Sequence, residues 1–336
     1  MEYRKLQRLG TSSYFITLPK EWVELLDLKA GDKIGMTLEQ DGTVKIIPKG
    51  KEYKPKRVLV VDASKVRELE FLIPYLMTCA YIFGYDTIEL KDLVYDPTLN
   101  SKINEFLTLY TGMVAVDQSH HSVRVECVID TSKVDATTVL KRTLSIVVDD
   151  VIDVLLDNTK NPGINRTVPQ SIIVELRKLH NLVLRALVVG RREGLRTDTT
   201  VCFVAAALFE MLVNYMLTAA NTSSRLKPLI PQHIVNTLKD YYEKASEIVT
   251  TSILSLLSSS MQRAQTTIRK CREFLSEVDD LLLTVVSGVD HENAALIANI
   301  IVRIADAVKI SLVISNIAVC SSMIKTSEGI AEKIVR

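Results

Sequence analysis

The sequence has no strong excess of charge of either sign, because 41 Lys and Arg are balanced by 40 Asp and Glu in 336 residues. The net charge is +1, so any basic patch that attracts nucleic acid must be local. Common enzyme motifs are also missing from the sequence: it has no phosphate-binding Gly-rich loop, no His-Glu-x-x-His zinc motif and no nucleophile elbow. We therefore predict that the protein is not an enzyme.

Cysteine is scarce, and no two cysteines are close together in the sequence. The absence of a Cys-x-x-Cys spacing argues against a disulfide framework or a zinc ribbon and predicts reduced, mostly buried thiols. The first ten residues, MEYRKLQRLG, contain no apolar stretch of the kind found in secretory signal peptides. We therefore expect a cytoplasmic protein. The five cysteines are Cys79, Cys127, Cys202, Cys271 and Cys320.

Long uncharged apolar runs are few, and the most membrane-like one is VCFVAAALFEMLVNYMLTAA at residues 201–220. This run is long enough to cross a bilayer. Glu210 and Asn214 lie at its centre, however, where polar groups are costly in lipid. The other long helices that we predict carry charges on one face, as helices of soluble bundles do. We therefore predict a core helix of a bundle and no membrane insertion.

What the sequence does contain at its start is a compact, strand-rich segment with basic residues at its edge. YFITLP at 14–19 alternates like a strand, Pro19 stops it, and KEWVELLDL predicts a short amphipathic helix. Two further strands are expected at about 33–39 and 43–47, joined at QDGT, where Asp-Gly is a strong hairpin signal. Because so few residues make a poor core, we predict that residues 1–50 form a domain that pairs with a second copy.

This segment resembles the AbrB/SpoVT family over residues 3–49. The shared features are a basic opening strand, a Gly-Ser-type turn, an ITLPK core and a Gly-Asp turn before the last hairpin. The matching residues are Arg4, Gly10, Ile16, Thr17, Leu18, Pro19, Lys20, Leu28, Gly31, Asp32 and Pro48. The resemblance implies a swapped-hairpin homodimer that binds DNA.

The same resemblance implies which side chains face the DNA. The positions carried over are Arg4, Lys5, Arg8 and Lys20. The first three would lie on the opening strand, and the last would follow its partner strand. The alternative is that these are ordinary solvated charges on a small surface. A dimer would present two such basic edges, and binding to phosphates strengthens with the number of contacts.

Residues 57–130 predict a small α/β linker domain. The expected elements, in the order βαβαββ, lie at 57–62, 64–83, 86–90, 96–110, 112–118 and 122–130. This order predicts helices over one sheet. The first strand is not followed by a Gly-rich loop, so we expect no nucleotide site. His120 and His121 would point to opposite sides of a strand, so we predict that they belong to a turn and not to a metal site.

Residues 132–336 predict an all-helical body. Turn signals divide it near 158–165, 191–198, 225–232, 258–262 and 287–293. The intervals correspond to six helices of about 20 to 35 residues, longer than the globular average. Short connections make successive helices antiparallel, so we predict two three-helix bundles. The fold class is therefore multidomain α+β, with a swapped-hairpin head, an α/β linker domain and an all-α body.

The helical body resembles the PhoU family of phosphate-uptake regulators, which is built from two three-helix repeats. LKRTLSIVVDDVIDVLLDN at 140–158 is similar to that family's opening helix, and RIADAVKISLVISNIA at 303–318 to the signature of its repeat-ending helix. A PhoU-type body joined through an α/β linker to an AbrB-type head resembles an archaeal regulator architecture.

The resemblance also implies metal-binding pairs of carboxylates one helical turn apart, and these are incomplete here. Asp149 and Asp153 keep this spacing on the first helix. On the third helix Glu210 is followed four residues later by Asn214. Asp306 on the sixth helix has no acidic residue four positions before it. These acids are weak metal candidates, and ion pairs on a solvated helix face are the alternative, so we predict no metal or other cofactor.

Glu210 still requires a partner. It lies between the apolar runs AAALF and MLV, where an unpaired carboxylate is costly. Arg303, on the matching helix of the second repeat, is one candidate for this partner.

Our leading hypothesis is a DNA-binding transcriptional regulator linked to phosphate homeostasis, whose helical body senses a signal or oligomerises. The first alternative is an adaptor that docks on a phosphate transporter or another protein, with a head that only dimerises. The second alternative is an architectural protein that coats DNA without sequence preference. All three hypotheses predict a homodimer or a larger assembly.

Overall fold

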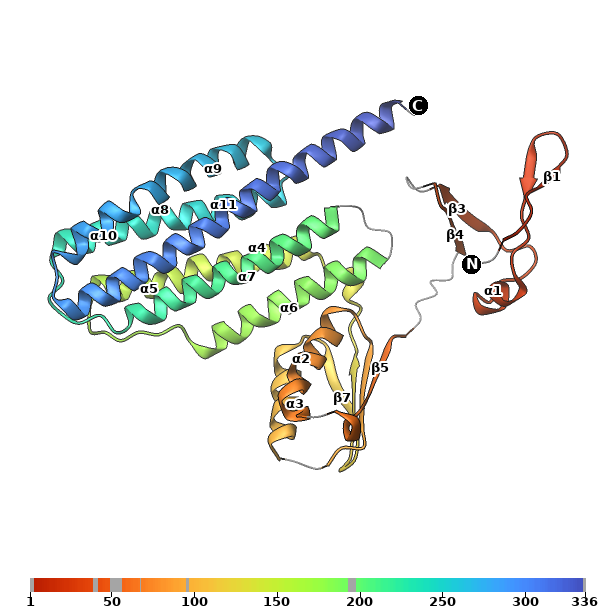
Figure 1. The fold of residues 1–336 in the computed structure, drawn as a ribbon, viewed down its shortest axis with the longest axis horizontal. Helices are drawn as coiled ribbons and strands as arrows, with labels where there is room; N and C mark the ends of the chain where they lie inside the picture. The colour runs from red at the N-terminus through yellow and green to blue at the C-terminus, as the bar shows by residue number, and fades with distance from the viewer. Residues whose placement is uncertain are drawn as a thin grey trace. The chain divides into compact units, whose positions relative to one another are not determined.

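The computed structural model describes residues 3–38, 42–48, 56–66, 68–94, 97–192 and 198–334. The chain divides into two compact units, Met1–Lys56 and Arg57–Arg336 (Figure 1). We call the first unit the head. As predicted, the protein is a mixed α+β chain with a small strand-containing N-terminal part and a mostly helical remainder.

The described residues of the head form two separate antiparallel hairpins and one short helix. In the first hairpin, β1 (Gln7–Leu9) pairs with β2 (Ser13–Phe15), and in the second, β3 (Ile34–Leu38) pairs with β4 (Val44–Pro48). Helix α1 (Lys20–Leu25) lies between the hairpins in sequence. Strand β2 is shorter than the predicted 14–19, because its ladder with β1 ends at Phe15.

The predicted turn of the second hairpin is only partly described. Gln40 and Asp41 lie outside the described residues. Gly42 has a φ of +81°, a left-handed conformation that glycine adopts without steric cost. The glycine of the predicted Asp-Gly signal therefore has the backbone conformation that a tight hairpin turn uses.

The segment after the head has the predicted βαβαββ order. Its elements are β5 (Val58–Asp62), α2 (Leu69–Ile82), β6 (Thr87–Lys91), α3 (Pro97–Leu109), β7 (Met113–Gln118) and β8 (Val123–Cys127). The strand order in the sheet is β5-β6-β8-β7, with β5 parallel to β6 and the other pairs antiparallel. Both helices lie on one face of this sheet (Figure 1), where their apolar side chains form a buried cluster with those of the strands.

Helix α2 begins five residues later than predicted. The Asp62 carboxylate accepts a hydrogen bond from the Ser64 backbone N–H at 3.1 Å and opens a short 3₁₀ turn, Ala63–Lys65. Glu68 then has a left-handed backbone conformation, with a φ of +51°, directly before the helix. Side-chain bonding by Asp competes with helix formation at this position.

The remainder of the chain is helical. Its helices are α4 (Ala136–Ile146), α5 (Ile152–Lys160), α6 (Gln170–Arg192), α7 (Asp198–Ser223), α8 (Gln232–Leu257), α9 (Met261–Ser276), α10 (Val278–Val286) and α11 (His291–Ile334). A π-helical turn, Val147–Val151, joins α4 to α5, and Glu277 separates α9 from α10. The described residues therefore form six helical segments that are divided near the predicted turns. Neither of the two interruptions within a segment was predicted.

Residues that start or interrupt helices explain the lengths of these segments. Helix α8 begins directly after Pro231. Proline is favoured at the start of a helix, because an N–H there would have no partner within the helix. Helix α9 begins where the Ser260 hydroxyl accepts a hydrogen bond from the Arg263 backbone N–H at 3.3 Å. Helix α11 has 44 residues, more than the predicted maximum, because no proline or glycine occurs between residues 291 and 328.

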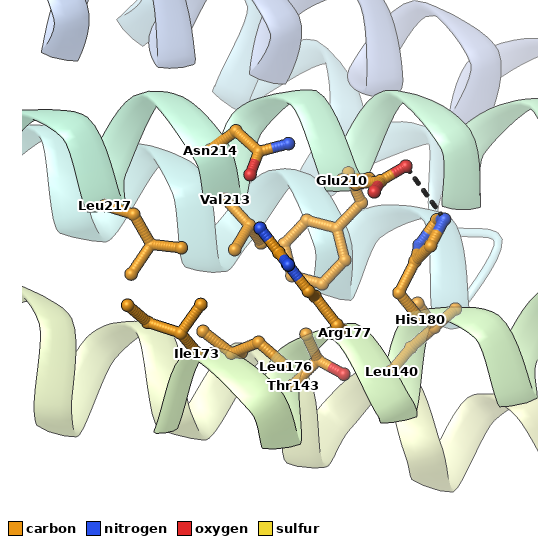
Figure 2. Close-up of a pocket in the computed structure, with 11 residues that line it drawn as sticks. Leu140, Thr143, Ile173, Leu176, Arg177, His180, Glu210, Val213, Asn214 and Leu217 are labelled. Atoms are coloured by element: carbon orange, nitrogen blue, oxygen red, sulfur yellow. Dashed lines mark ion pairs between the residues drawn. The ribbon is translucent and has the colours of Figure 1, made fainter. Parts of the chain in front are cut away.

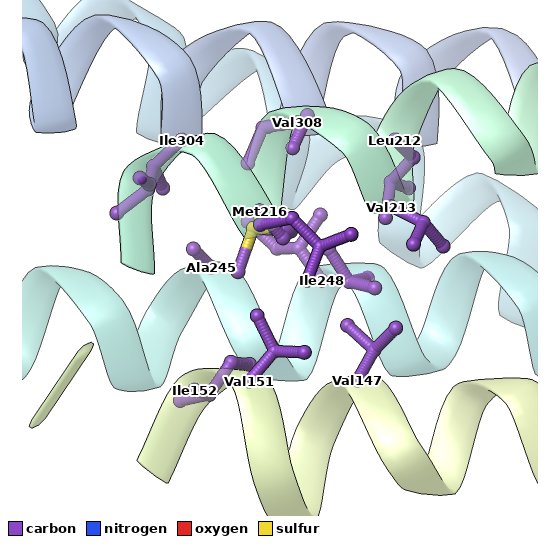
Figure 3. Close-up of a cluster of buried hydrophobic side chains, with 14 of the residues drawn as sticks. Val147, Val151, Ile152, Leu212, Val213, Met216, Ala245, Ile248, Ile304 and Val308 are labelled. Atoms are coloured by element: carbon purple, nitrogen blue, oxygen red, sulfur yellow. The ribbon is translucent and has the colours of Figure 1, made fainter. Parts of the chain in front are cut away.

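One buried apolar cluster extends through the helical body from α4 to α11. Figure 3 shows side chains of several helices converging, among them Val147, Met216, Ile248 and Ile304. The grouping into two three-helix bundles stays a prediction, as does the domain division at about residue 131. By length and composition alone α7 could cross a membrane, but Met216 and its buried neighbours pack in this shared cluster.

A buried arginine joins α6 to the α/β segment. The Arg185 side chain is 2% exposed, and its Nη1 donates hydrogen bonds to the carbonyl oxygens of Tyr81 at 2.7 Å and Tyr85 at 2.9 Å. Its Nε donates to the Thr131 hydroxyl at 3.2 Å. The guanidinium also lies 4.9 Å from the centroid of the Tyr81 ring. Arg185 therefore links α6 to the C-terminal end of α2 through buried hydrogen bonds.

Candidate functional site

The structure places the predicted DNA-binding residues around the first hairpin of the head. Arg8 lies on β1 opposite Tyr14, and its Nη2 donates a hydrogen bond to the Thr11 carbonyl oxygen at 2.9 Å. Arg4 and Lys5 precede β1, so the prediction that all three lie on the opening strand was wrong for these two. The strand is short because its ladder begins only at Gln7.

Lys20 is the first residue of α1, after the hairpin. Its ammonium lies 3.5 Å from the Glu24 carboxylate, and its side chain is 88% exposed. An exposed pair of this kind contributes little free energy, so the ammonium remains available to another anion.

The head carries more positive charge than the whole-chain balance suggests. Residues 1–56 contain eleven Lys and Arg against eight Asp and Glu, a net charge of +3. Since the whole chain has a net charge of +1, the remainder is net negative. The excess of positive charge that would favour a nucleic-acid partner is therefore in the head.

Apolar side chains of the head are exposed in the single chain. Of the head residues whose burial the structure describes, Pro19 alone is buried. Met36 and Leu38 on β3 are 75% and 74% exposed, and Tyr14 on β2 is 63% exposed. Exposed apolar surface of this extent in so small a unit marks an interaction site.

Two of the weak metal candidates lie on the first helical segment, and both have protein partners. The Asp149 carboxylate accepts a hydrogen bond from the Ser145 hydroxyl at 2.7 Å. Asp153 forms an ion pair with Arg166 at 2.9 Å, and Asp157 pairs with the same guanidinium. Arg166, in the loop after α5, therefore pairs with both the Asp153 and the Asp157 carboxylates, where a metal ion would otherwise have to bind.

Asp306 on α11 is also held by cations. Its carboxylate lies 3.6 Å from Arg303 and 3.0 Å from Lys309 on the same helix. Within the part of the chain that the structure describes, no three His, Cys, Asp or Glu side chains are grouped so that they could hold a metal ion. The absence of a bound metal therefore stays a prediction.

The partner of Glu210 is His180, not Arg303. The Nε2 of His180 on α6 lies 3.0 Å from the Glu210 carboxylate on α7. This hydrogen bond holds the pKa of the Glu210 carboxyl below its ordinary value, and the charge of Arg177 acts in the same direction. Arg303 is engaged elsewhere, by Asp306 and by the ring of Tyr215.

His180 and Glu210 line a cavity between α4, α6 and α7 (Figure 2). Sequence reasoning found Glu210 and Asn214 but missed Arg177 and His180, which lie on the facing helix. The sequence does contain a pattern that could have found these two residues. Ile173, Leu176, Arg177 and His180 follow the i, i+3, i+4, i+7 spacing of one helix face. Two basic residues on an otherwise apolar face indicate a polar partner opposite.

Replacing His180 with leucine is expected to raise the pKa of the Glu210 carboxyl, because burial would then outweigh the weaker effect of Arg177. In the native chain the lowered pKa means that the pair stabilises the fold above the unfolded-state value near 4.5, and that this contribution disappears as the pH falls. NMR titration of the carboxyl carbon measures the shift. The matched control is His233→Leu on α8, which should leave the Glu210 titration unchanged, and an unchanged titration in His180→Leu would contradict the assignment.

Comparison with known proteins finds a similarity in the head alone. Residues 7–54 match the family described as antidote-toxin recognition MazE, bacterial antitoxin. The head is similar to the MazE antitoxins. This family belongs to the AbrB-like swapped hairpins, so the match supports the resemblance found in residues 3–49. It does not extend into the helical body, where the PhoU resemblance stays a prediction. No curated protein and no solved structure matches the chain.

Proposed function

We propose that the protein is a DNA-binding transcriptional regulator whose head binds DNA as a homodimer. The observation that carries the proposal is the match of residues 7–54 to an AbrB-like family with DNA-binding or antitoxin-type regulatory members. The net charge of +3 in residues 1–56 supports it, because two heads bring twice that charge to one duplex.

The finer parts of the proposal concern the body. It acts as a cytoplasmic sensing or oligomerisation module without enzymatic activity, and its looser PhoU resemblance, with two three-helix repeats, links it to phosphate homeostasis. Docking of the body on a phosphate transporter component belongs to the adaptor alternative.

A second candidate is an antitoxin-type role, which the description of the matched family favours. In that role the chain would bind a toxin protein as well as DNA. The size of the unit Arg57–Arg336, with its own buried clusters, fits a sensing module better than a short toxin-binding segment.

Binding to two duplexes separates the proposal from its alternatives. One duplex is selected from a random library by the full-length protein, and the other is a random sequence of equal length. A regulator is expected to prefer the selected duplex, an architectural protein to bind both equally, and an adaptor to bind neither. If the dimer neutralises about four to six phosphates, log K should fall against log salt with a slope of roughly −4 to −5. Fluorescence anisotropy at several salt concentrations measures both quantities.

The full-length protein is expected to be at least a dimer at micromolar concentration, with a mass of at least twice 37.6 kDa by light scattering. Replacing Met36 and Leu38 with glutamate should dissociate the head contact, because these side chains are 75% and 74% exposed in the single chain and need a partner to be buried.

The matched control for this pair is Leu283→Glu on α10, whose side chain is 73% exposed. This variant should keep the native mass. A monomeric native protein would refute the swapped-hairpin interpretation of the head.

A further inference from the structure

The cavity between α4, α6 and α7 has a graded lining. Its volume is about 60 Å³, which at roughly 10–15 Å³ for each water is room for about four to six waters, and the cavity opens to solvent beside Glu210, whose side chain is 50% exposed. Two facing helix stripes form most of the wall. The stripe on α6 is Ile173, Leu176, Arg177 and His180, and the stripe on α7 is Glu210, Val213, Asn214 and Leu217.

The two stripes place polar groups at one end of the cavity and apolar groups at the other. Figure 2 shows Glu210 and His180 together at one end, and Ile173 and Leu217 at the opposite end. Leu140 and Thr143 of α4 and Phe209 of α7 complete the lining. A cavity with this lining is complementary to a molecule with a charged group and an apolar tail.

The middle of the cavity contains polar groups without a protein partner. Arg177 extends from α6 toward α7, where Asn214 lies (Figure 2). Among the described residues, neither the Arg177 guanidinium nor the Asn214 side-chain amide makes a hydrogen bond or a close ion pair. Glu210, in contrast, is already hydrogen-bonded to His180. Both residues are exposed, so solvent satisfies these two donors in the free protein, and both are open to a ligand.

We propose that this cavity binds a small organic carboxylate with a short apolar tail. The carboxylate pairs with the planar guanidinium of Arg177 and accepts from the Asn214 amide, an arrangement that guanidinium groups favour for carboxylates. The tail extends toward Ile173 and Leu217 and is removed from water there. The negative charge of Glu210 at the polar end disfavours a ligand with a second negative charge, such as phosphate or a dicarboxylate.

Two sources can supply this chemistry, and Glu210 distinguishes them. A simple monocarboxylate uses only Arg177 and Asn214. An α-amino acid with an apolar side chain adds an ammonium group, which the Glu210 carboxylate attracts. The inference goes beyond the proposed regulatory role by naming a ligand class, and it does not require DNA. A chain that fails to bind DNA can therefore still bind this ligand, and the reverse also holds.

The test is calorimetric titration of the full-length protein, without DNA, with five probes. The probes are 3-methylbutanoate, leucine, 3-methylbutanol, succinate and inorganic phosphate. We expect 3-methylbutanoate or leucine to bind at least about tenfold more tightly than the other three probes. 3-Methylbutanol has no carboxylate, succinate has two carboxylates and no apolar tail, and phosphate has neither group. The tighter of the two identifies the source of the carboxylate.

Two variants locate the binding. Arg177→Met should weaken the preferred probe at least about tenfold, because the charged hydrogen bonds of the guanidinium are lost. The matched control is Arg142→Met, which removes an α4 guanidinium that lies 3.1 Å from Glu175 and does not line the cavity. Arg142→Met should keep the native affinity. Absence of binding by all five probes, tightest binding of phosphate, or equal losses in the two variants would each overturn the proposal.

Discussion

Full-length protein in which Arg4, Lys5 and Arg8 are all alanine is expected to lose detectable DNA binding at about 0.15 M salt. The three substitutions remove six positive charges from a dimer, which is the upper end of the roughly four to six phosphates that we expect it to neutralise. Because log K depends linearly on the number of phosphate contacts, losing most of them removes nearly all of the electrostatic free energy of binding. Lys20 alone does not replace them.

The control for this variant removes equal charge elsewhere. Its substitutions are Lys239→Ala, Lys244→Ala and Lys270→Ala, at lysines that form ion pairs on α8 and α9. Anisotropy titration of both variants on the same duplex measures the difference, and the control should bind as the native protein does. Native affinity in the Arg4, Lys5 and Arg8 variant, with the dimer intact by light scattering, would show that the DNA-binding face lies elsewhere.

Arg185→Leu is expected to lower the free energy of unfolding of residues 57–336 by about 3 kcal/mol, because the carbonyl groups of Tyr81 and Tyr85 lose their buried donor. The contact with Asp86 adds little to this figure, since the distance is 3.7 Å and the Asp86 side chain is 41% exposed. Lysine is also a poor replacement, because one ammonium cannot reproduce the fixed fork of a guanidinium. Denaturant unfolding followed by circular dichroism measures the loss.

Arg142→Leu is the matched control for Arg185, because it removes a guanidinium whose side chain is 56% exposed. Its expected effect on the free energy of unfolding is within about 0.5 kcal/mol. If the midpoint of denaturant unfolding is the same for Arg185→Leu and the native protein, the buried guanidinium does not fix α6 to the α/β segment.

Elements with a local signal were predictable from the sequence. The α/β segment follows the predicted order because its strands alternate and are bounded by clear turn residues. The starts of α8 and α9, at Pro231 and Ser260, are marked by residue types that favour a helix N-terminus and can be recognised in a single sequence. The start of α2 was predicted too early, because the side chain of Asp62 bonds the backbone two residues later and delays the helix.

Contacts between residues far apart in sequence were not predictable. His180 and Glu210 are 30 residues apart, and Arg185 bonds residues that precede it by 100 or more. No periodicity encodes such pairs. The sequence does show an arginine inside the apolar run LVLRALVV at 182–189, and a cation there requires buried acceptors. That signal could have identified Arg185 as a buried contact, but not the segment that receives it.

Because few residues of the head are buried in the single chain, the proposed dimer would make the stability of the head depend on protein concentration. A unit that buries its apolar side chains only against a second copy is folded to an extent set by the amount of chain present. Residues 57–336, in contrast, have buried clusters within the single chain. In the proposed dimer, occupancy of a DNA site would then rise with the square of the chain concentration at low levels. The cellular abundance of the chain would therefore act as a threshold for regulation, before any ligand is bound.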